Sequence, residues 1–433
     1  MLKAAVLYDQ TTTWLKLSIH IGDIYLCLPC LLHDLTLTME STVNDTHCDG
    51  DATLDLRFAG EEQLAGYFYS QEERFIILAF YPISFLFGLV ANISFLLVLF
   101  QIREMRTITN AYLGNLAVAD ILFLCSVDYH FLFSYFPSPK VKSLAYTSSA
   151  GCAINVTIQY MAHFASIALV FLMTVERYLG ICKTFYHRLI IAKGRTLKLI
   201  IFAWVFGLAY ACAFVAPRSY VLVKTCVLWP ESDMYLDLPN VLHSRSPLHP
   251  FYKQMPSILQ AVPFSAAMIC TIVMYALIVK KLTERVSTFN QGDQQSQQIS
   301  KVRDNVARLL IANGTVFFLA YVPFYVTRFN YALLAITDNR VGYQTTPNVR
   351  GAIDWSVVCL ATVNSFINPV IYSLTNERYR RAFVHVFTCQ TSRMKTNKSN
   401  VSSISQSGTS NTISHIVMNN HNHVNGNDNN GNT

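Results

Sequence analysis

Three charged residues at two sites stand inside long apolar stretches, where an ionised side chain is costly unless it has a function. Asp120 lies within the stretch Ile108–Tyr135 and is the one clear deep carboxylate. The pair Glu176-Arg177 lies near the end of the stretch Cys152–Cys182. A deep carboxylate can bind a cation, and an arginine beside a glutamate can form an ion pair that breaks and re-forms. The chemistry predicted from these residues is therefore ion binding and switching.

The composition is that of a polytopic membrane protein. Of the 433 residues, 52% are hydrophobic and 14% are charged, and the mean hydropathy is +0.32. A soluble domain carries about 25% charged residues. The formal net charge of +7 does not indicate nucleic-acid binding, because the basic residues gather in short segments between apolar stretches, as the positive-inside rule describes.

Seven apolar stretches are long enough to cross a bilayer as helices. Lys and Arg follow the first, third and seventh stretches and flank the loop after the fifth, which predicts that these segments are cytoplasmic and that the N-terminus is extracellular. The predicted fold is an all-α membrane protein, a seven-transmembrane helix bundle, with an extracellular segment at 1–74, the bundle at 75–389 and a disordered cytoplasmic tail at 390–433. The stretches are Phe75–Ile102, Ile108–Tyr135, Cys152–Cys182, Leu197–Ala216, Tyr252–Leu282, Val302–Leu334 and Ala352–Leu374.

The segment Asn376–Phe387, after the seventh stretch, predicts a short amphipathic eighth helix. Tyr379, Phe383 and Phe387 share one helical face, and arginines occupy other positions. Such a helix lies in the interface between membrane and water. The bundle is therefore expected to end in an eighth helix that runs along the membrane surface.

Short motifs with polar or proline residues recur within the apolar stretches. In kind, order and position they resemble the GN, LAxAD, E/D-R-Y, FxxCWxP and NPxxY patterns of rhodopsin-like (class A) G-protein-coupled receptors. Cys152 lies 25 positions before Arg177 (177 − 152), about 37 Å of helix at 1.5 Å per residue, which agrees with this resemblance. The resemblance covers Phe75 to Cys389. The motifs are Gly88–Asn92, Asn115–Asp120, Glu176-Arg177-Tyr178, Phe317–Pro323, Asn364-Ser365 and Asn368–Tyr372.

The resemblance implies an allosteric sodium site around the deep carboxylate. Sodium is a hard cation that prefers oxygen ligands, and it would offset the buried charge. A water-filled polar network without an ion is the alternative. The implied ligand residues are Asp120, Ser166, Asn364, Ser365 and Asn368.

The resemblance also implies an activation switch, in which Arg177 pairs with Glu176 at rest and turns toward the G protein when the sixth helix moves outward. Pro323 breaks a backbone hydrogen bond and supplies a kink in that helix. Tyr321 stands where the family has Trp. The implied switch residues are Glu176, Arg177, Tyr178, Phe317, Tyr321, Pro323, Asn368, Pro369 and Tyr372.

The fifth stretch departs from the family pattern. Pro263 and Tyr275 are 12 positions apart (275 − 263), where the family spaces them by 8. Either the proline stands one turn higher, which we favour, or Tyr275 does not bridge Arg177 and Tyr372.

The candidate ligand pocket argues against two ligand classes and favours a third. Gln159 stands where amine receptors have an Asp, so a cationic amine would lack that counter-ion, and Ala352–Leu374 has no Lys for a retinal Schiff base. The pair Gln159-Tyr160, within Ile158–Val175, resembles peptide receptors near the thyrotropin-releasing-hormone receptor. Aromatic walls with a few polar groups suit a compact peptide end. The candidate residues are Gln159, Tyr160, His163, Phe324, Tyr325, Arg328, Asp354 and Trp355.

The long loop Pro217–Phe251 carries Glu231, Asp233 and Asp237, which suits a basic peptide or serves only solvation. The expected partners are therefore an extracellular neuropeptide agonist, a heterotrimeric G protein, arrestin and the lipid bilayer of the plasma membrane. No enzymatic activity and no nucleic acid are expected, and sodium is the one expected ion.

Four residues are candidates for covalent modification. Cys152 and Cys226 both face the oxidising compartment on this topology, so we expect a disulfide between them, with two free thiols as the alternative. Asn44, in Asn44-Asp45-Thr46, is a candidate glycosylation site. Cys389 is a candidate palmitoylation site or a free thiol.

The two ends of the chain allow more than one interpretation. Ile24–Leu32 is apolar but short and contains Pro29; it is a poor signal-peptide core, a membrane-touching segment or part of an over-extended gene model. The tail from Thr391 is rich in Ser, Thr and Asn and predicted to be disordered. Its hydroxyl residues are either phosphorylation sites that recruit arrestin or a solvated polar tail.

Other classes of protein fit less well. A transporter predicts inverted repeats or paired broken helices, and an enzyme requires a nucleophile with its base or a group of metal ligands. Neither pattern is evident in the sequence. Within receptors, the alternatives are a lipid or other small-molecule agonist, or a weakly coupling orphan receptor.

Overall fold

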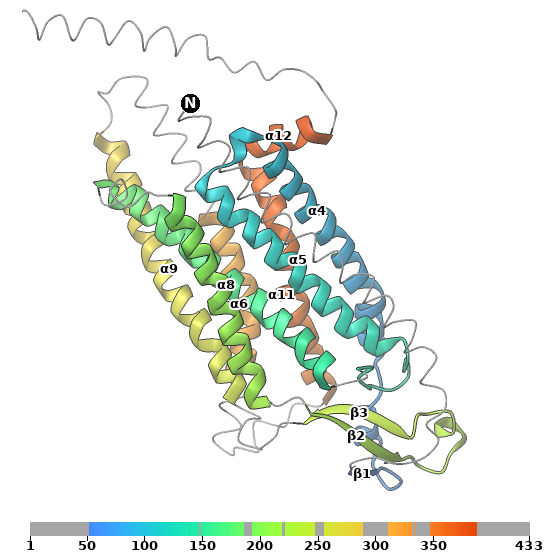
Figure 1. Ribbon diagram of the computed structural model, residues 1–433. Coiled ribbons are helices and arrows are strands. Elements are labelled where there is room, and N and C mark those ends of the chain that lie inside the picture. The colour runs from blue at the N-terminus through green and yellow to red at the C-terminus, as the bar shows by residue number, and fades with distance from the viewer. Residues whose placement is uncertain are drawn as a thin grey trace, which may run out of the picture. The chain divides into compact units, whose positions relative to one another are not determined.

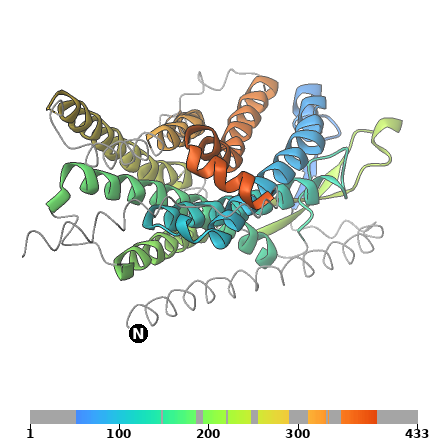
Figure 2. The same ribbon diagram turned by 90° about the horizontal axis from the view of Figure 1, so that it is seen from above.

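The computed structural model describes residues 52–146, 149–185, 193–218, 221–246, 255–288, 311–330, 333 and 347–387. The chain divides into two compact units, Met1–Phe383 and Val384–Thr433, and the long helices of the first unit lie side by side as a bundle (Figure 1, and from above in Figure 2). The helices are α2 (Glu61–Ala65), α3 (Gln71–Phe75), α4 (Tyr81–Gln101), α5 (Ile108–Tyr135), α6 (Ser149–Cys182), α8 (Lys193–Arg218), α9 (Met255–Thr288), α11 (Pro347–Thr375) and α12 (Glu377–Phe387).

Six helical segments within the described residues are long and apolar enough to cross a membrane, and they confirm six of the seven predicted stretches. Residues 311–330 are helical as well and belong to the predicted sixth stretch, whose two ends lie outside the described residues. The six are Gln71–Gln101, Ile108–Tyr135, Ala150–Cys182, Gly194–Ala213, Leu259–Glu284 and Ile353–Thr375.

One face of α4 shows why these helices belong in a bilayer. Ile83, Val90 and Leu97 are exposed, and their spacing of seven places them in one stripe along the helix. Asn92 and Phe95 on the other side are fully buried. Apolar side chains point outward and a polar one points inward, which is the arrangement that a lipid environment requires.

Close packing joins α8 to its neighbours. The Trp204 Nε1 of α8 donates to Asn115 Oδ1 of α5 over 3.0 Å. A Cβ on Gly207 would lie 2.7 Å from the Met161 carbonyl oxygen and 2.9 Å from the Ala165 nitrogen of α6. Only glycine permits such an approach of two helix backbones, as is common between membrane helices.

A three-stranded sheet caps one end of the bundle (Figure 1). The strand β1 (Ala52–Asp55) runs parallel to β2 (Val221–Leu228), which pairs antiparallel with β3 (Val241–Ser246); Thr53 lies opposite Cys226, and Cys226 lies opposite Val241. We call this end the sheet end. No strands were predicted at this end. The strand β1 has only four residues, too few for a periodic pattern, and its hydrogen-bond partner β2 lies far along the chain.

The sheet has a small core of its own. Its buried residues come from the segment before the first span, from the connection between α5 and α6, and from the β2–β3 hairpin. They are Leu56, Leu64, Val141, Val227, Trp229, Leu238 and Leu242. Residues 52–69, the last part of the segment predicted at 1–74, therefore pack against the later loops at this end of the bundle.

The first long helix begins earlier than the predicted residue Phe75. Ser70 Oγ accepts from the Glu73 backbone N–H, and Glu73 Oε2 accepts from the Ser70 backbone N–H. This capping box starts the helix at Gln71. A π-helical turn, Ile76–Phe80, then continues into α4.

Candidate functional site

Asp120 lies fully inside the bundle, among the residues predicted to hold sodium. The Asn368 Nδ2 of α11 donates to Asp120 Oδ2 over 2.8 Å. Ser166 of α6 and Asn364 and Ser365 of α11 are buried as well. Asn368 and Asp120 are therefore in contact, and all five residues predicted to hold sodium are buried on α5, α6 and α11. We call these five residues the Asp120 centre: Asp120, Ser166, Asn364, Ser365 and Asn368.

Several polar atoms at the Asp120 centre are buried without a hydrogen-bond partner among the described residues. They include Asn364 Oδ1 and Asn368 Oδ1. Asn92 of α4 donates through Nδ2 to the Ser365 carbonyl over 2.8 Å, which ties α4 to α11. A carboxylate with nearby unpaired amide oxygens is a donor set that suits a hard monovalent cation.

Tyr321, at the position where the family has Trp, reaches the same centre. Its side chain is buried, lies near Asn364 and Ser365, and is within electrostatic range of Asp120. The ring of Phe317, one turn earlier, is 5.1 Å from that of Tyr321. The phenol therefore adds a hydroxyl where the family's Trp has an indole N–H.

An aromatic cluster connects the Asp120 centre with the sheet-end half of the bundle. His163 of α6 is hydrogen-bonded through Nε2 to the hydroxyl of Tyr325, and its ring lies 4.9 Å from that of Tyr321. Phe264 of α9 stacks on Tyr325 with ring centres 3.9 Å apart. We call His163, Phe264, Tyr321 and Tyr325 the aromatic cluster; the sequence analysis missed Phe264, which follows Pro263 directly.

The other predicted pocket residues on these helices are partly accessible. Gln159 and Tyr160, one turn from His163, are half-buried, as are Phe324 and Arg328. The Arg328 guanidinium stands 5.1 Å from the centre of the Phe324 ring. These four positions therefore lie on the same two helices, α6 and the 311–330 helix, as His163, Tyr321 and Tyr325 of the aromatic cluster.

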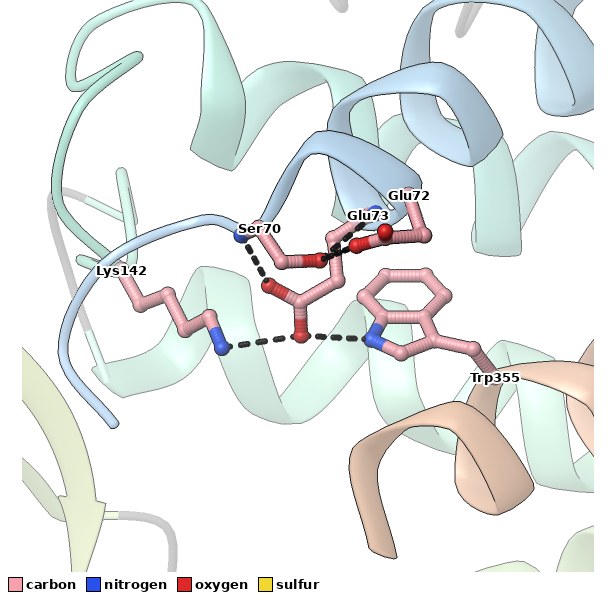
Figure 3. A network of polar contacts seen from close by, with 5 residues as sticks. All are labelled: Ser70, Glu72, Glu73, Lys142 and Trp355. Carbon is pink, nitrogen blue, oxygen red and sulfur yellow. Dashed lines mark hydrogen bonds and ion pairs between the residues drawn. The ribbon is translucent and has the colours of Figure 1, made fainter. Parts of the chain in front are cut away.

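Trp355, on α11, belongs to a different group of contacts, and its neighbour Asp354 has a buried Oδ1 without a hydrogen-bond partner among the described residues. The Trp355 Nε1 donates to Glu73 Oε1 over 2.7 Å, and Lys142 Nζ donates to the same oxygen over 2.8 Å (Figure 3). Glu73 is 7% exposed, and its other oxygen closes the capping box with Ser70. We call Ser70, Glu73, Lys142 and Trp355 the Glu73 network.

The Glu73 network was not predicted, although part of its signal is in the sequence. The Ser70-x-x-Glu73 spacing, just before an apolar run, is the known capping-box pattern. That Lys142 and Trp355 meet the same carboxylate depends on three segments distant in sequence. No spacing rule brings these segments together.

A second carboxylate inside a span corrects the sequence analysis, which identified Asp120 as the one clear deep carboxylate. Asp128 of α5 is 4% exposed, and neither of its oxygens has a hydrogen-bond partner among the described residues. Asp128 lies within the predicted stretch Ile108–Tyr135, but its position near the end of that stretch did not indicate that its side chain is buried in the bundle.

Glu176, Arg177 and Tyr178 lie near the end of α6 away from the sheet. Arg177 has Glu176 and Tyr379 as electrostatic neighbours, and Glu176 also lies near Arg195 and the Tyr112 hydroxyl. Tyr178 packs against the buried pair Ile181 and Ile278. The predicted pairing of Glu176 with Arg177 stays a prediction, since Glu176 has further partners.

Tyr275 of α9 points into the bundle despite its unusual spacing from Pro263. Thr174 Oγ1 of α6 donates to the Tyr275 hydroxyl over 3.3 Å. A Cβ on Gly314 would lie 2.0 Å from that hydroxyl oxygen. Tyr275 therefore fills a space that Gly314 leaves open on the 311–330 helix. Its partner Thr174 lies one turn before Arg177 on α6.

Tyr372 and Tyr379 complete this end of the bundle. The buried Tyr372 ring lies 5.1 Å from that of Phe95 and 5.9 Å from that of Tyr379. The Tyr379 hydroxyl donates to Asn110 Oδ1, and burial raises the pKa of Tyr379 to about 12, so the hydroxyl stays protonated at neutral pH. Pro369 lies within α11, between these tyrosines and the Asp120 centre.

Of the predicted modification sites, the structure describes two cysteines. Cys226 is in a disulfide bond, and Cys152 is buried near the start of α6. The pairing of Cys152 with Cys226 stays a prediction. Asn44 and Cys389 lie outside the described residues.

Comparison with known proteins identifies the family to which this chain belongs. The family described as 7 transmembrane receptor (rhodopsin family) matches residues 91–372. This chain belongs to that family, so it is a G-protein-coupled receptor that spans the membrane several times and is not an enzyme.

Individual relatives are distant. The thyrotropin-releasing hormone receptor of Gallus gallus is 26% identical over 338 residues, which cover 71% of this chain and 77% of the relative. The neuropeptide FF receptor 1 of Homo sapiens is 25% identical over 369 residues, covering 79% and 76%. The C-C chemokine receptor type 3 of Macaca fascicularis is 25% identical over 316 residues, covering 71% and 78%.

Proposed function

We propose that this protein is a plasma-membrane receptor for an extracellular neuropeptide, and that the sheet end of the bundle is extracellular. The observation that carries this proposal is the aromatic cluster. It connects His163, one turn after the partly accessible Gln159 and Tyr160 on α6, with Tyr321 beside the Asp120 centre. The names of the relatives, two of which are receptors for a hormone or neuropeptide, support a peptide ligand.

The ligand end is expected to enter among Gln159, Tyr160, Phe324 and Arg328. Arg328 can donate to a peptide carboxylate or carbonyl, and its stacking on Phe324 holds the guanidinium in place. A ligand that displaces Tyr325 or His163 moves Tyr321, since their rings are in contact. Binding is in this way linked to the 311–330 helix.

Activation is proposed to proceed by outward movement of the 311–330 helix about Pro323. At the opposite end this movement separates Gly314 from Tyr275 and frees space beside Arg177 for the G protein. A ligand shifts this equilibrium only by its differential affinity for the two states. Arrestin is proposed to bind the phosphorylated C-terminal tail afterwards.

The Asp120 centre is proposed to hold sodium in the inactive state. Asp120, Ser166, Asn364, Ser365 and Asn368 would supply the oxygen ligands, and the ion would offset the carboxylate charge. Asn368 hydrogen-bonds Asp120 directly, so these two side chains hold α5 and α11 together inside the bundle.

The test is calcium and cAMP signalling in cells that express the full chain, challenged with a library of amidated short peptides. A saturable response is expected, and Gln159→Ala or Arg328→Ala should weaken it about tenfold or more with surface expression kept. Arg177→Ala should abolish G-protein activation while peptide binding remains. Silence to all peptides at confirmed surface expression, with a response to lipids or other small molecules, would move the ligand to those classes.

A further inference from the structure

Asp128 is a buried carboxylate that the proposed activation mechanism does not use. It is 4% exposed, and both carboxylate oxygens are without a hydrogen-bond partner among the described residues. Glu73, the other buried carboxylate of the sheet-end half, accepts from Lys142, Trp355 and Ser70. A buried carboxylate without a partner is costly, so Asp128 is the exception that requires a reason.

The position of Asp128 is on the ligand side of the bundle. It follows Asp120 by 8 residues (128 − 120) on α5, which is about 12 Å toward the sheet end at 1.5 Å per residue. It lies within electrostatic range of Tyr81 on α4, whose own hydroxyl is buried without a partner among the described residues. Cys359 of α11 is near the same hydroxyl. Asp128 therefore faces the region where α4, α5 and α11 meet.

Three aromatic rings gather in that region. The Tyr81 and Phe131 rings stack at 4.6 Å, and the Trp355 ring lies 5.0 Å from Phe131 and 6.2 Å from Tyr81. On α11, one residue before Trp355, Asp354 Oδ1 is also buried without a partner among the described residues. Aromatic faces beside a carboxylate attract cations and reject anions.

The unpaired atoms determine the chemistry of the missing partner. The two Asp128 oxygens and Asp354 Oδ1 are acceptors, and the Tyr81 hydroxyl can accept as well. A positively charged group that donates N–H bonds satisfies the unpaired Asp128 oxygens, and the nearby Tyr81 hydroxyl can accept from the same group. Lys142, the basic residue of the Glu73 network, already pairs with Glu73, and neither Asp128 oxygen has a basic partner among the described residues.

We propose that Asp128 is the anchor for a guanidinium or ammonium group of the agonist, so that the peptide is a basic one. This inference rests on the proposed peptide-receptor function and narrows its ligand class. It also supplies, on α5, the counter-ion that Gln159 fails to supply on α6. The Tyr81, Phe131 and Trp355 rings form the walls of this anchor, and Trp355 is held in place by Glu73.

The experiment compares two pools of amidated short peptides on the purified full-length receptor in lipid nanodiscs. The pools are matched except that every arginine of the first is citrulline, its uncharged near-isostere, in the second. We expect the arginine pool to stabilise the receptor against thermal unfolding at a concentration about tenfold to a hundredfold lower than the citrulline pool, because only the charged guanidinium forms charge-assisted hydrogen bonds with the Asp128 carboxylate.

Two variants complete the test. In Asp128→Asn the two pools should act at the same concentration, and without peptide this variant should be no less stable than wild type, because it removes an unpaired buried charge. Glu61→Gln, an exposed carboxylate-to-amide change at the same end, should keep the wild-type preference for the arginine pool.

Each other result counts against the proposal. Equal stabilisation of wild type by both pools, or an arginine preference that survives Asp128→Asn, overturns the cationic anchor and leaves a peptide receptor. A marked loss of stability in peptide-free Asp128→Asn overturns it as well, since the role is then structural. No stabilisation by either pool overturns the anchor together with the peptide function.

Discussion

The Glu73 network and the Asp120 centre are both buried, polar and built from distant segments, yet they differ in how far their hydrogen bonds are satisfied. The two Glu73 oxygens accept from Trp355, Lys142 and the Ser70 backbone. At the Asp120 centre, one bond from Asn368 stands beside unpaired amide oxygens. A satisfied network holds one arrangement, whereas an unsatisfied one leaves room for an ion or for a second arrangement.

Movement is therefore expected where buried polar groups lack hydrogen-bond partners, and not at the Glu73 network. Glu73 fixes the start of the first span to α11 and to the connection before α6, so the sheet end is braced. At the Asp120 centre, Asn364 Oδ1 and Asn368 Oδ1 have no partner among the described residues, so its contacts are cheaper to exchange than those of Glu73. The contact of Gly314 with Tyr275 is proposed to open on activation. The following changes test the comparison, in order of expected effect.

Removal of the Glu73 carboxylate should give the largest loss of stability. Glu73→Ala leaves the Lys142 ammonium and the Trp355 N–H without their acceptor, and we expect a loss of about 3 kcal/mol in the free energy of unfolding. Thermal unfolding of the purified receptor measures it. Glu62→Ala, an exposed glutamate in the preceding short helix α2, is the matched control and should change little; equal effects of the two variants would contradict a bracing role.

Gly314→Ala tests the exchangeable contacts at the opposite end. The added methyl group meets the Tyr275 hydroxyl, so the inactive packing should lose about 2 kcal/mol, a typical cost of overpacking. Basal G-protein activation should rise as the 311–330 helix separates from α9. Adding Tyr275→Phe removes the hydroxyl and should restore part of the loss; an unchanged loss in the double variant would locate the strain elsewhere.

Asp120→Asn tests whether the open centre binds sodium. In wild type, replacing choline chloride by sodium chloride should raise thermal stability by about 1.4 kcal/mol when sodium is at ten times its dissociation constant, and should lower basal signalling. The variant should lose both effects, because the amide has no charge to offset. Glu61→Gln should keep them, and a sodium effect that persists in Asp120→Asn would favour a water-filled network.

Ser70→Ala is expected to have the smallest effect. It removes the side-chain acceptor for the Glu73 backbone N–H but leaves the Glu73 carboxylate with Lys142 and Trp355, so the loss should be about 1 kcal/mol. Ser70→Asp, another good N-cap, should recover most of it in the same unfolding measurement. A loss as large as that of Glu73→Ala would show that the cap, and not the three-segment network, braces this end.

The membrane class and the positions of six spans could be predicted from the amino-acid sequence alone. Apolar stretches of sufficient length predict helices whatever their neighbours are, because a bilayer leaves the backbone no other partners. The motifs around Asp120, Arg177, Tyr321 and Tyr372 were likewise predicted, since each is a local pattern on one helix. The Asp120–Asn368 bond agrees with the grouping implied by those motifs.

The contacts between side chains distant in sequence could not be predicted and are seen only in the tertiary structure. The parallel pairing of β1 with β2, the placement of Lys142 and Trp355 on Glu73, and the lack of a partner for Asp128 depend on how loops and helices pack. Burial and hydrogen bonding belong to the packed structure and not to any one segment. The sequence does not show whether a buried carboxylate has hydrogen-bond partners. This difference distinguishes Glu73, which stabilises the sheet end, from Asp128, the candidate ligand anchor.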